Sequence, residues 1–353
     1  LEYVGRYYAR CLRFYYPRWL GFCALVMTVM RCAASKLDFL RRYLPFSSGV
    51  ASAQTFRRVF RALDGEAFQE SFIAWSSWLT GKLSVVVALD GKTLCGSKHA
   101  ACGEGALHLL SAISHETGLV IGSRAVDKKS NEITAIPELL EQLALEGAIV
   151  TLDAMGAQLT IAEAILAKDA DYLIALKGNQ ATLHEDVRLF FDEHSPQVAW
   201  QSCQDTDAGH GRIEERNCLV TADINWLQER HQWPGLQSII CIQASRIDKR
   251  SGNATTKTRF YLSSLKPDAK IILDARRAHW SIENTILWSM DVTFKDDLCR
   301  SRKDHAALNF TIIKHTAFNI IIQINDKISL KNKRKKAGWD HQSLTKCIHF
   351  NYS

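Results

Sequence analysis

The chain has 353 residues, of which 47% are hydrophobic and 23% are charged, the composition of a soluble globular protein. Its length allows two or three domains, or one large domain with insertions. The ten cysteines include no CxxC pair. This excludes the usual sequence patterns of a zinc site or a disulfide framework, so reduced cysteines in a cytoplasmic protein are the simpler interpretation.

Positive charge is concentrated at the two ends of the chain. Residues 1–61 contain 11 Lys and Arg against 2 Asp and Glu, residues 62–326 contain 26 against 34, and residues 327–353 contain 7 against 1. Basic ends around an acidic centre are typical of a protein whose ends contact polyanions and whose centre collects carboxylates. The alternative for the basic C-terminal tail is a solvated, disordered end.

The first 35 residues have an atypical pattern. Several arginines precede the apolar run WLGFCALVMTVM, which imitates a secretory signal. The run is too short to span a bilayer, and nothing downstream resembles a secreted protein. We therefore expect a cytoplasmic protein without a membrane partner, and fractionation would test the secreted alternative.

Helical and extended patterns follow in order. Residues 36–80 place apolar residues at three- and four-residue steps, which predicts helices. Strands are then predicted at 83–90, 107–113 and 119–126, and the short link SHETG indicates an antiparallel meander. A helix, strand, helix and strand at 131–146, 147–154, 156–169 and 171–176 predict parallel strands covered on both faces. The remaining predicted elements are a helix at about 180–193, three antiparallel strands within 200–265, and helices at about 268–290 and 304–325. The three strands are expected at RIEERNCLV, SIICIQAS and TRFYLSS.

Two aspartates stand where buried strands end. Asp90 ends LSVVVALD, and Asp153 ends the strand in GAIVTLDA. Ligand and metal sites of α/β sheets occur at such a rim. If the first and fourth strands are parallel neighbours, the two carboxylates lie side by side and favour a cation between them, for which Mg²⁺ or Mn²⁺ is suited. A turn-forming role is the alternative for an Asp before Gly.

The stretch AHWSIENTILW, residues 278–288, carries one acid, Glu283, among apolar residues at helical spacing. A late helix laid across the sheet rim would bring this carboxylate to the same cations. Two metal ions about 3.5–4 Å apart hold the attacking and leaving oxygens of an in-line phosphoryl transfer. An N-cap role, a salt bridge or a surface position is the alternative. Trp280 and Trp288 are expected to anchor the core rather than to stack on bases.

Several polar side chains are candidates for contacts with DNA. Lys177 and Asn179 open a helix after a strand, where backbone N–H groups bind phosphates, with an ordinary turn as the alternative. Arg277 and His279 approach Glu283 and are candidates for the scissile phosphate, with surface placement as the alternative. Two further candidates, His210 and Arg212, lie in HGRIEER at the start of the inserted strands.

The element order resembles the ribonuclease-H-like fold, and residues 200–265 resemble the β-rich insertion of one branch of DDE transposases. From about Lys36 to about Lys346 the chain resembles insertion-sequence transposases of the ISAs type, the group that includes H-repeat-associated proteins. The motifs that carry this resemblance are ALDGKTLCGS, KKSNEITAIPELL, GAIVTLDAMGAQ, ADYLIALKGNQ, HGRIEER, RFYLSSL, RAHWSIEN and DVTFKDD. The expected fold is α/β, with a mixed sheet, a β-rich insertion and a helical N-terminal segment.

The resemblance implies a function and a site. Asp90, Asp153 and Glu283 would be the catalytic triad and would hold two Mg²⁺ or Mn²⁺ ions. The activity would be cleavage and strand transfer at the ends of the element. The partners would be double-stranded DNA, as terminal inverted repeats and as target, and further copies of the chain, at the nucleoid. A catalytically inactive DNA-binding relic and a nuclease of the same fold without transposition remain alternatives.

The resemblance also implies three regions. These are a helical N-terminal region at 1–80, a catalytic domain at 81–325 that contains the insertion, and a basic tail at 326–353. Residues 1–35 do not resemble the family. A reading-frame shift would explain both this departure and a start at Leu1 instead of Met.

Overall fold

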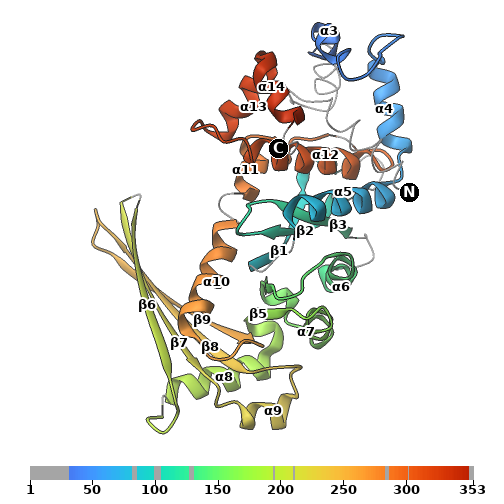
Figure 1. Ribbon diagram of the computed structural model, residues 1–353. Coiled ribbons are helices and arrows are strands. Elements are labelled where there is room, and N and C mark those ends of the chain that lie inside the picture. The colour runs from blue at the N-terminus through green and yellow to red at the C-terminus, as the bar shows by residue number, and fades with distance from the viewer. Residues whose placement is uncertain are drawn as a thin grey trace.

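The structure is a computed structural model that describes residues 32–81, 86–98, 105–126, 131–193, 195–209, 211–282, 286–300 and 302–349. Among these residues, nine strands form one mixed sheet in the order β3-β2-β1-β4-β5-β9-β8-β7-β6 (Figure 1). The strands are β1 Val86–Leu94, β2 Leu107–Ser114, β3 Val120–Val126, β4 Ile149–Leu152, β5 Asp171–Leu176, β6 Gln201–Gly209, β7 Arg212–Thr221, β8 Ser238–Asp248 and β9 Ala254–Ser263.

The first five strands have the predicted topology. β1, β2 and β3 form an antiparallel meander, and β1, β4 and β5 pair in parallel. Parallel strands of this kind are covered on both faces, and the central residues of β1, β4 and β5 are accordingly buried. The mixed sheet confirms the expected ribonuclease-H-like fold class.

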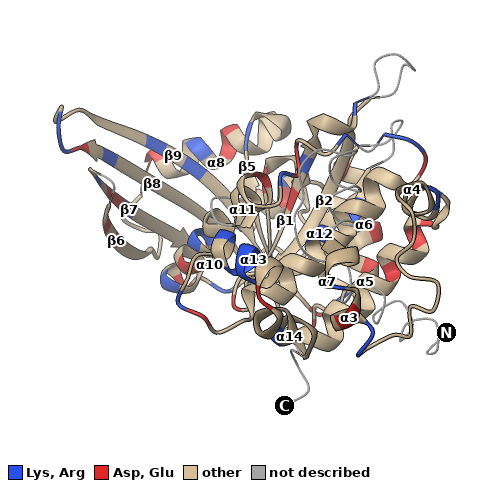
Figure 2. Cartoon of the chain, turned by 90° about the horizontal axis from the view of Figure 1, so that it is seen from above, with Lys and Arg blue, Asp and Glu red and all other residues tan. Residues whose placement is uncertain are grey.

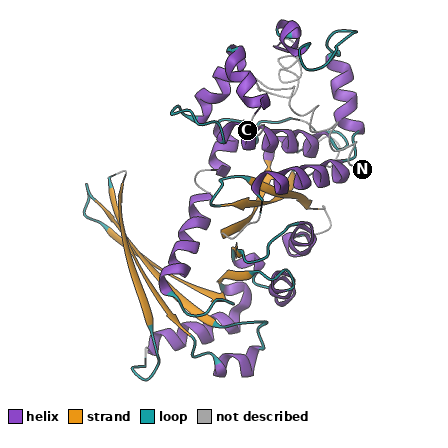
Figure 3. Cartoon of the chain, viewed as in Figure 1, coloured by secondary structure: helices purple, strands orange, loops and turns teal. Residues whose placement is uncertain are grey.

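The inserted strands extend the same sheet. β9 pairs antiparallel with β5, and β8, β7 and β6 follow in antiparallel order, so the sheet continues into a long arm that projects from the core (Figure 3). β6 was not predicted. Its sequence, QSCQDTDAG, is polar and largely exposed, as expected of an edge strand that discourages further pairing, and it therefore lacks the apolar alternation from which strands are predicted.

Helices cover the sheet and form a cap of their own. They are α3 Leu37–Leu40, α4 Ala53–Ala62, α5 Gly65–Thr80, α6 Glu132–Gln142, α7 Leu159–Leu166, α8 Ala181–Glu193, α9 Asn225–His231, α10 Ala269–Ile282, α11 Trp288–Val292, α12 Ala306–Ile322, α13 Leu330–Trp339 and α14 His341–His349. In Figure 1, α5 and α12 lie on one side of β1–β3, and α6 and α7 lie on the other. Short 3₁₀ turns stand at η1 Cys95–Ser97, η3 Ala154–Gly156 and η4 Gly178–Gln180. No helix in the described ranges is both long enough and apolar enough to cross a membrane.

Two predicted helices have different bounds. The helix expected at 268–290 is described as α10 and α11, and residues 283–285 between them lie outside the described residues. The helix expected at 131–146 ends at Gln142, and Pro137 lies in its interior.

The basic C-terminal segment forms two helices. α13 contains the run KNKRKK, and Figure 2 shows Lys and Arg gathered on it. Lys336 pairs with Asp326 at 3.0 Å, and α14 buries Leu344 and Ile348 against Phe39 of α3. The alternative of a disordered end is therefore wrong for residues 330–349. It arose because α13 is almost entirely polar and shows no apolar stripe.

Candidate active site

Two of the predicted acids meet at the rim of the sheet. β1 and β4 pair in parallel with Leu89 opposite Leu152. Asp90 and Asp153 are the next residues along these two strands. The expectation that both strands end here is wrong for Asp90, because β4 ends at Leu152 whereas β1 continues to Leu94 and pairs Asp90 with Ser111 of β2. Asp90 therefore lies inside β1, beside the point where β4 ends. Both line one cavity of about 610 Å³. The expectation that the first and fourth strands are parallel neighbours is confirmed.

The walls of this cavity are rich in cations and aromatic rings. α10 contributes Arg276 and Trp280, and β9 contributes Lys257, Arg259 and Tyr261. The three β9 residues stand at alternate positions, which places their side chains on one face of the strand. The two carboxylates, Asp90 and Asp153, line the same cavity. The arrangement is an anionic centre surrounded by positive side chains, as needed to hold a phosphodiester around bound cations.

Lys177 is the immediate partner of Asp153. Its Nζ lies 2.9 Å from Oδ1 and 3.2 Å from Oδ2 of that carboxylate. Burial would raise the pKa of Asp153, but the hydrogen bonds from Lys177 and from the Ala154 backbone outweigh it, and the pKa is lowered from 3.8. The two side chains are 55% and 62% exposed. An ion pair this open to water is weak, so a divalent cation can compete with Lys177 for Asp153.

Asn179 has a bracing role in the structure. Its Nδ2 donates to the backbone oxygen of Ala154 at 2.6 Å, and Gln180 Nε2 donates to that of Ala157 at 2.8 Å. These bonds tie the turn after β5 to the turn after β4. Of the two residues predicted to open a phosphate site, Lys177 lines the cavity, whereas the Asn179 amide fixes the loop that follows Asp153.

His279 joins α10 to the sheet. Its Nδ1 lies 2.8 Å from the hydroxyl oxygen of Thr151 on β4. Burial, together with the nearby Arg276 guanidinium, lowers the pKa of His279 to about 4, although Asp153 acts in the opposite direction. The imidazole is therefore neutral at pH 7. It lines the cavity, and its bond to Thr151 holds α10 over β4, the strand that Asp153 follows.

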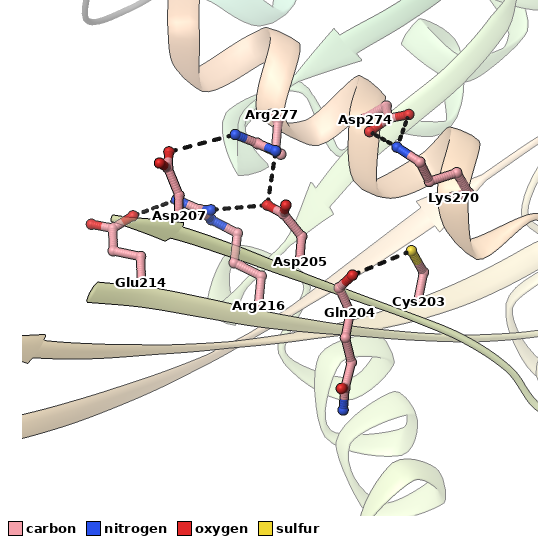
Figure 4. Close-up of polar contacts among 9 residues, drawn as sticks. All are labelled: Cys203, Gln204, Asp205, Asp207, Glu214, Arg216, Lys270, Asp274 and Arg277. Carbon is pink, nitrogen blue, oxygen red and sulfur yellow. Dashed lines mark hydrogen bonds and ion pairs between the residues drawn. The ribbon is translucent and has the colours of Figure 1, made fainter. Parts of the chain in front are cut away.

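Arg277 faces away from the cavity and toward the arm. It pairs with Asp205 at 2.8 Å and with Asp207 at 3.6 Å, both on β6 (Figure 4). The preceding residue, Arg276, lines the cavity and donates to the Tyr261 hydroxyl at 2.5 Å. Sequence analysis named Arg277 and missed Arg276. The signal that distinguishes them is helical spacing, since 276, 279 and 280 share one face of α10.

The remaining predicted residues lie elsewhere or outside the described residues. Arg212 stands at the far end of the β6–β7 hairpin, opposite Gly209. Glu283 and His210 lie outside the described residues. Sequence analysis also missed His184, Lys257 and Arg259 of the cavity lining. The alternation of Lys257, Arg259 and Tyr261 was a signal for two of these, although the predicted strand TRFYLSS begins one residue after Lys257.

The tryptophans differ from expectation. Trp280 and Trp288 are 41% and 58% exposed, so the prediction that they anchor the core is wrong. Ile282 and Ile286 are buried and take that role. Trp280 borders the cavity, where an aromatic ring can stack on an unpaired base.

The donor set suits a hard divalent cation. The cavity presents two carboxylates and offers no thiol, and carboxylate oxygens are the ligands that Mg²⁺ and Mn²⁺ prefer. Within the described ranges no group of three His, Cys, Asp or Glu side chains is gathered closely enough to hold a metal ion. The two acids therefore fit as part of a metal site whose third expected ligand, Glu283, is outside those ranges.

Comparison with known proteins identifies the class. The family described as "Transposase DDE domain" matches residues 81–320, and "DDE_Tnp_1-associated" matches residues 23–76. The chain belongs to the DDE transposase family. Transposases act on DNA and, in this family, generally use divalent metal ions, so DNA is the partner of this class of protein.

Individual relatives place the chain among insertion-sequence proteins. It is 37% identical over 312 residues to "Putative transposase YncI" of Escherichia coli O157:H7, covering 86% of this chain and 79% of that protein. It is 36% identical over 323 residues to "H repeat-associated putative transposase YhhI" of Escherichia coli K12, covering 88% and 84%. An "Uncharacterized protein in dhlA 3'region" of Xanthobacter autotrophicus is 39% identical over 236 residues, covering 66% and 79%. The resemblance to H-repeat-associated transposases is confirmed.

The family match also corrects one boundary. Sequence analysis found no resemblance before Lys36, but the associated region matches from residue 23. The apolar run in this part of the chain, which imitates a secretory signal, therefore falls largely within the family match.

Proposed function

We propose that the protein cleaves DNA at the ends of its own insertion sequence and transfers the resulting 3′ ends to target DNA. The observation that carries this proposal is the parallel register of β1 and β4, which brings Asp90 and Asp153 to one cavity. Cationic side chains of α10 and β9 surround the two acids. This combination suits the binding of a phosphodiester at a metal site.

Glu283 completes the proposed triad through the sequence pattern. The cavity-lining positions of α10 are 276, 279 and 280. In a helical pattern, position 283 is the next one on that face, since it follows position 280 by three residues and position 279 by four. The mature site would then contain three carboxylates from β1, from the end of β4 and from the segment that follows α10.

The chain's own residues would bind and orient DNA. Bound by Asp90, Asp153 and Glu283, two Mg²⁺ or Mn²⁺ ions would supply charge stabilisation and in-line geometry at the scissile phosphate. Arg259 and Arg276 would contact the non-bridging phosphate oxygens.

The reaction needs no covalent enzyme intermediate. In the first step a water oxygen forms a bond to phosphorus and the 3′ oxygen leaves, which gives a 3′-OH and a 5′-phosphate. In the second step the 3′-OH attacks a target phosphodiester, so one such bond forms as another breaks. Further copies of the chain would pair the two ends on the DNA.

A nicking assay tests the proposal. The natural chain, incubated with Mn²⁺ and DNA that carries an element end with its flank, should nick at the element boundary. Asp153→Ala should bind the same DNA and lose nicking by roughly 10³-fold or more, because the site loses a metal ligand. Asp192→Ala, which removes an exposed acid of α8, is the matched control and should nick normally.

The outcomes separate the alternatives. If the natural chain binds end DNA and never nicks it, this protein is an inactive relic. Nicking without strand-transfer products, when a pre-cut 3′-OH end and a target plasmid are supplied, would indicate a nuclease. Unchanged nicking by Asp153→Ala would remove that residue from the mechanism.

A further inference from the structure

A second cationic surface lies between α4 and the segment that precedes α12. Its residues line a hollow of about 410 Å³, which we call the α4 hollow. Six of the eight lining residues that the structure describes are cationic, and none of the eight is acidic. The cations are Arg57, Arg58, Arg61, Arg300, Arg302 and Lys303.

Helical periodicity builds one wall of this hollow. The α4 residues that line it are 54, 57, 58 and 61, spaced three and four apart on one face of the helix. The opposite face carries Phe56 and Phe60 toward the core, and the ring of Phe60 lies 4.7 Å from that of Phe310 on α12. α4 is thus amphipathic, with an apolar face toward the core and an opposite face that carries three arginines.

Both walls are held in place by specific bonds. Asn309 of α12 donates its amide to the backbone oxygens of Phe60 and Leu63, at 2.9 and 2.8 Å, and so fixes the end of α4. On the other wall, Arg302 Nε donates to the backbone oxygen of Gly96 at 3.2 Å. The arginines of α4 are therefore carried by an anchored helix, so ordering of its backbone adds little to the cost of binding a ligand.

The lining of the hollow differs from the arm in its balance of charge. On the arm, Arg216 pairs with Asp205 and Glu214, and Arg246 pairs with Glu214, so acids form part of that surface. The described lining of the hollow contains six cations and no acid, and Asp304, which pairs with Arg61 at 2.7 Å, is not among the lining residues. Six cations that line one hollow repel one another, and a polyanionic ligand would relieve that repulsion.

The hollow lies within reach of a duplex bound in the catalytic cavity. Gly96, which accepts the Arg302 bond, is in η1, directly after β1. A strand advances about 3.3 Å per residue, so Leu94 lies about 13 Å along β1 from Asp90. One turn of B-DNA is about 34 Å. The separation between Asp90 and the end of β1 nearest the Arg302 contact is therefore shorter than one turn of a duplex.

We propose that the α4 hollow binds the phosphate backbone of double-stranded DNA adjacent to the cleavage position. This inference rests on the proposed function only in taking DNA as the substrate. It assigns to the family-associated N-terminal region and to the segment at 300–303 a joint role in holding the duplex. That role is separate from cleavage, which belongs to the carboxylates.

Salt-dependent binding without added metal tests the proposal. Each phosphate contact adds about 0.9 to the slope of log affinity against log salt. Arg58→Ala/Arg300→Ala/Lys303→Ala should therefore lower the slope by about two to three and weaken binding at low salt, measured by fluorescence anisotropy on an end-containing duplex of about 30 base pairs, or three helical turns. The control Lys168→Ala/Arg188→Ala/Arg230→Ala removes the same charges from the α7–α9 side and should leave the slope unchanged.

Further control variants distinguish the role of charge from an effect on the fold. Arg58→Lys/Arg300→Lys preserves charge and should retain the natural slope, and thermal unfolding of each variant checks the fold. An unchanged slope in the folded triple variant would overturn the proposal. The triple variant could also lose binding of tripolyphosphate while it binds the duplex as tightly as the natural chain does. That result would assign the hollow to a small anion and would also overturn the proposal. Failure of the proposed function looks different, since DNA would bind with the natural salt slope and never be nicked.

Discussion

Lys177 lies beside Asp153, where its positive charge keeps the carboxylate ionised before a metal binds. Its ammonium contacts both carboxylate oxygens, and it keeps the pKa of Asp153 below its ordinary value even though burial would raise it. The ammonium thus maintains the ionised carboxylate that a metal requires. Because both side chains are largely exposed, water screens their attraction, and the pair stabilises the protein much less than a buried ion pair would.

Lys177→Met should therefore separate metal binding from DNA chemistry. Removing the competing ammonium should tighten Mn²⁺ binding by roughly two- to fivefold, the range expected for an exposed ion pair. Nicking should nevertheless slow, because a cation that can contact phosphate is lost from the cavity. An electron paramagnetic resonance titration measures free Mn²⁺, with Lys168→Met as the matched control. Weaker Mn²⁺ binding by Lys177→Met would show that Lys177 supports the metal instead of competing with it.

At the scale of elements, α10 is the helix that couples the cavity to the arm. One face carries Arg276 and His279 into the cavity, and Arg277 pairs with Asp205 and Asp207 of β6. The two acids of this edge strand therefore have two effects: they discourage the addition of another strand, and they fasten β6 to α10. The arm and the helix should move as one unit as long as this contact is intact.

A double-mutant cycle decides what Arg277 does. If Arg277 only fastens the arm, Arg277→Met and Asp205→Asn should each cost about 0.5–1 kcal/mol of unfolding free energy, and their coupling should be of similar size. Nicking by both variants should stay within a few fold of the natural rate. If Arg277 instead contacts the scissile phosphate, Arg277→Met alone should lose nicking by about 10²-fold or more, a loss of transition-state stabilisation that Asp205→Asn would not share. Denaturant titration and the nicking assay supply the two measurements.

At the scale of the whole molecule, periodic apolar patterns made much of the fold predictable. The strands β1–β5 and β7–β9 carry β-branched or alternating residues, from which the antiparallel meander and the parallel strands were predicted. The pairing of β9 with β5, by which the inserted strands continue the same sheet, was not predicted. β6, α13 and the short α9 were missed because they are polar, and their order comes from partners far away in the chain. For the same reason no local pattern could reveal the α4 hollow, which joins residues 57–61 to residues 300–303.

A largely buried charge network connects β1 to α11, α12 and the segment between those helices. Lys314 of α12 donates to Asp296 at 2.7 Å, and each side chain is only 2% exposed. Lys92, two residues beyond Asp90 on β1, pairs with Asp291 and lies 4.0 Å from Asp296. Burial would raise the pKa of Asp296, but Lys314 and Lys92 outweigh it and the pKa is lowered. The network therefore fixes β1, the strand that carries Asp90, to the segment that follows α11.

Removing one charge from this network should be far more damaging than removing a matched pair. Lys314→Met leaves the Asp296 carboxylate buried without its closest partner, and should cost about 3–5 kcal/mol of unfolding free energy, read from denaturant midpoints. Lys314→Met/Asp296→Leu removes both charges and should recover most of that loss, because the desolvation penalty is removed together with the attraction. Lys331→Met, at an exposed position of α13, should change little. The double variant could instead be as unstable as the single variant. In that case the attraction between Lys314 and Asp296 helps to hold β1 against the helical layer, and the instability of the single variant does not come only from an unpaired buried charge.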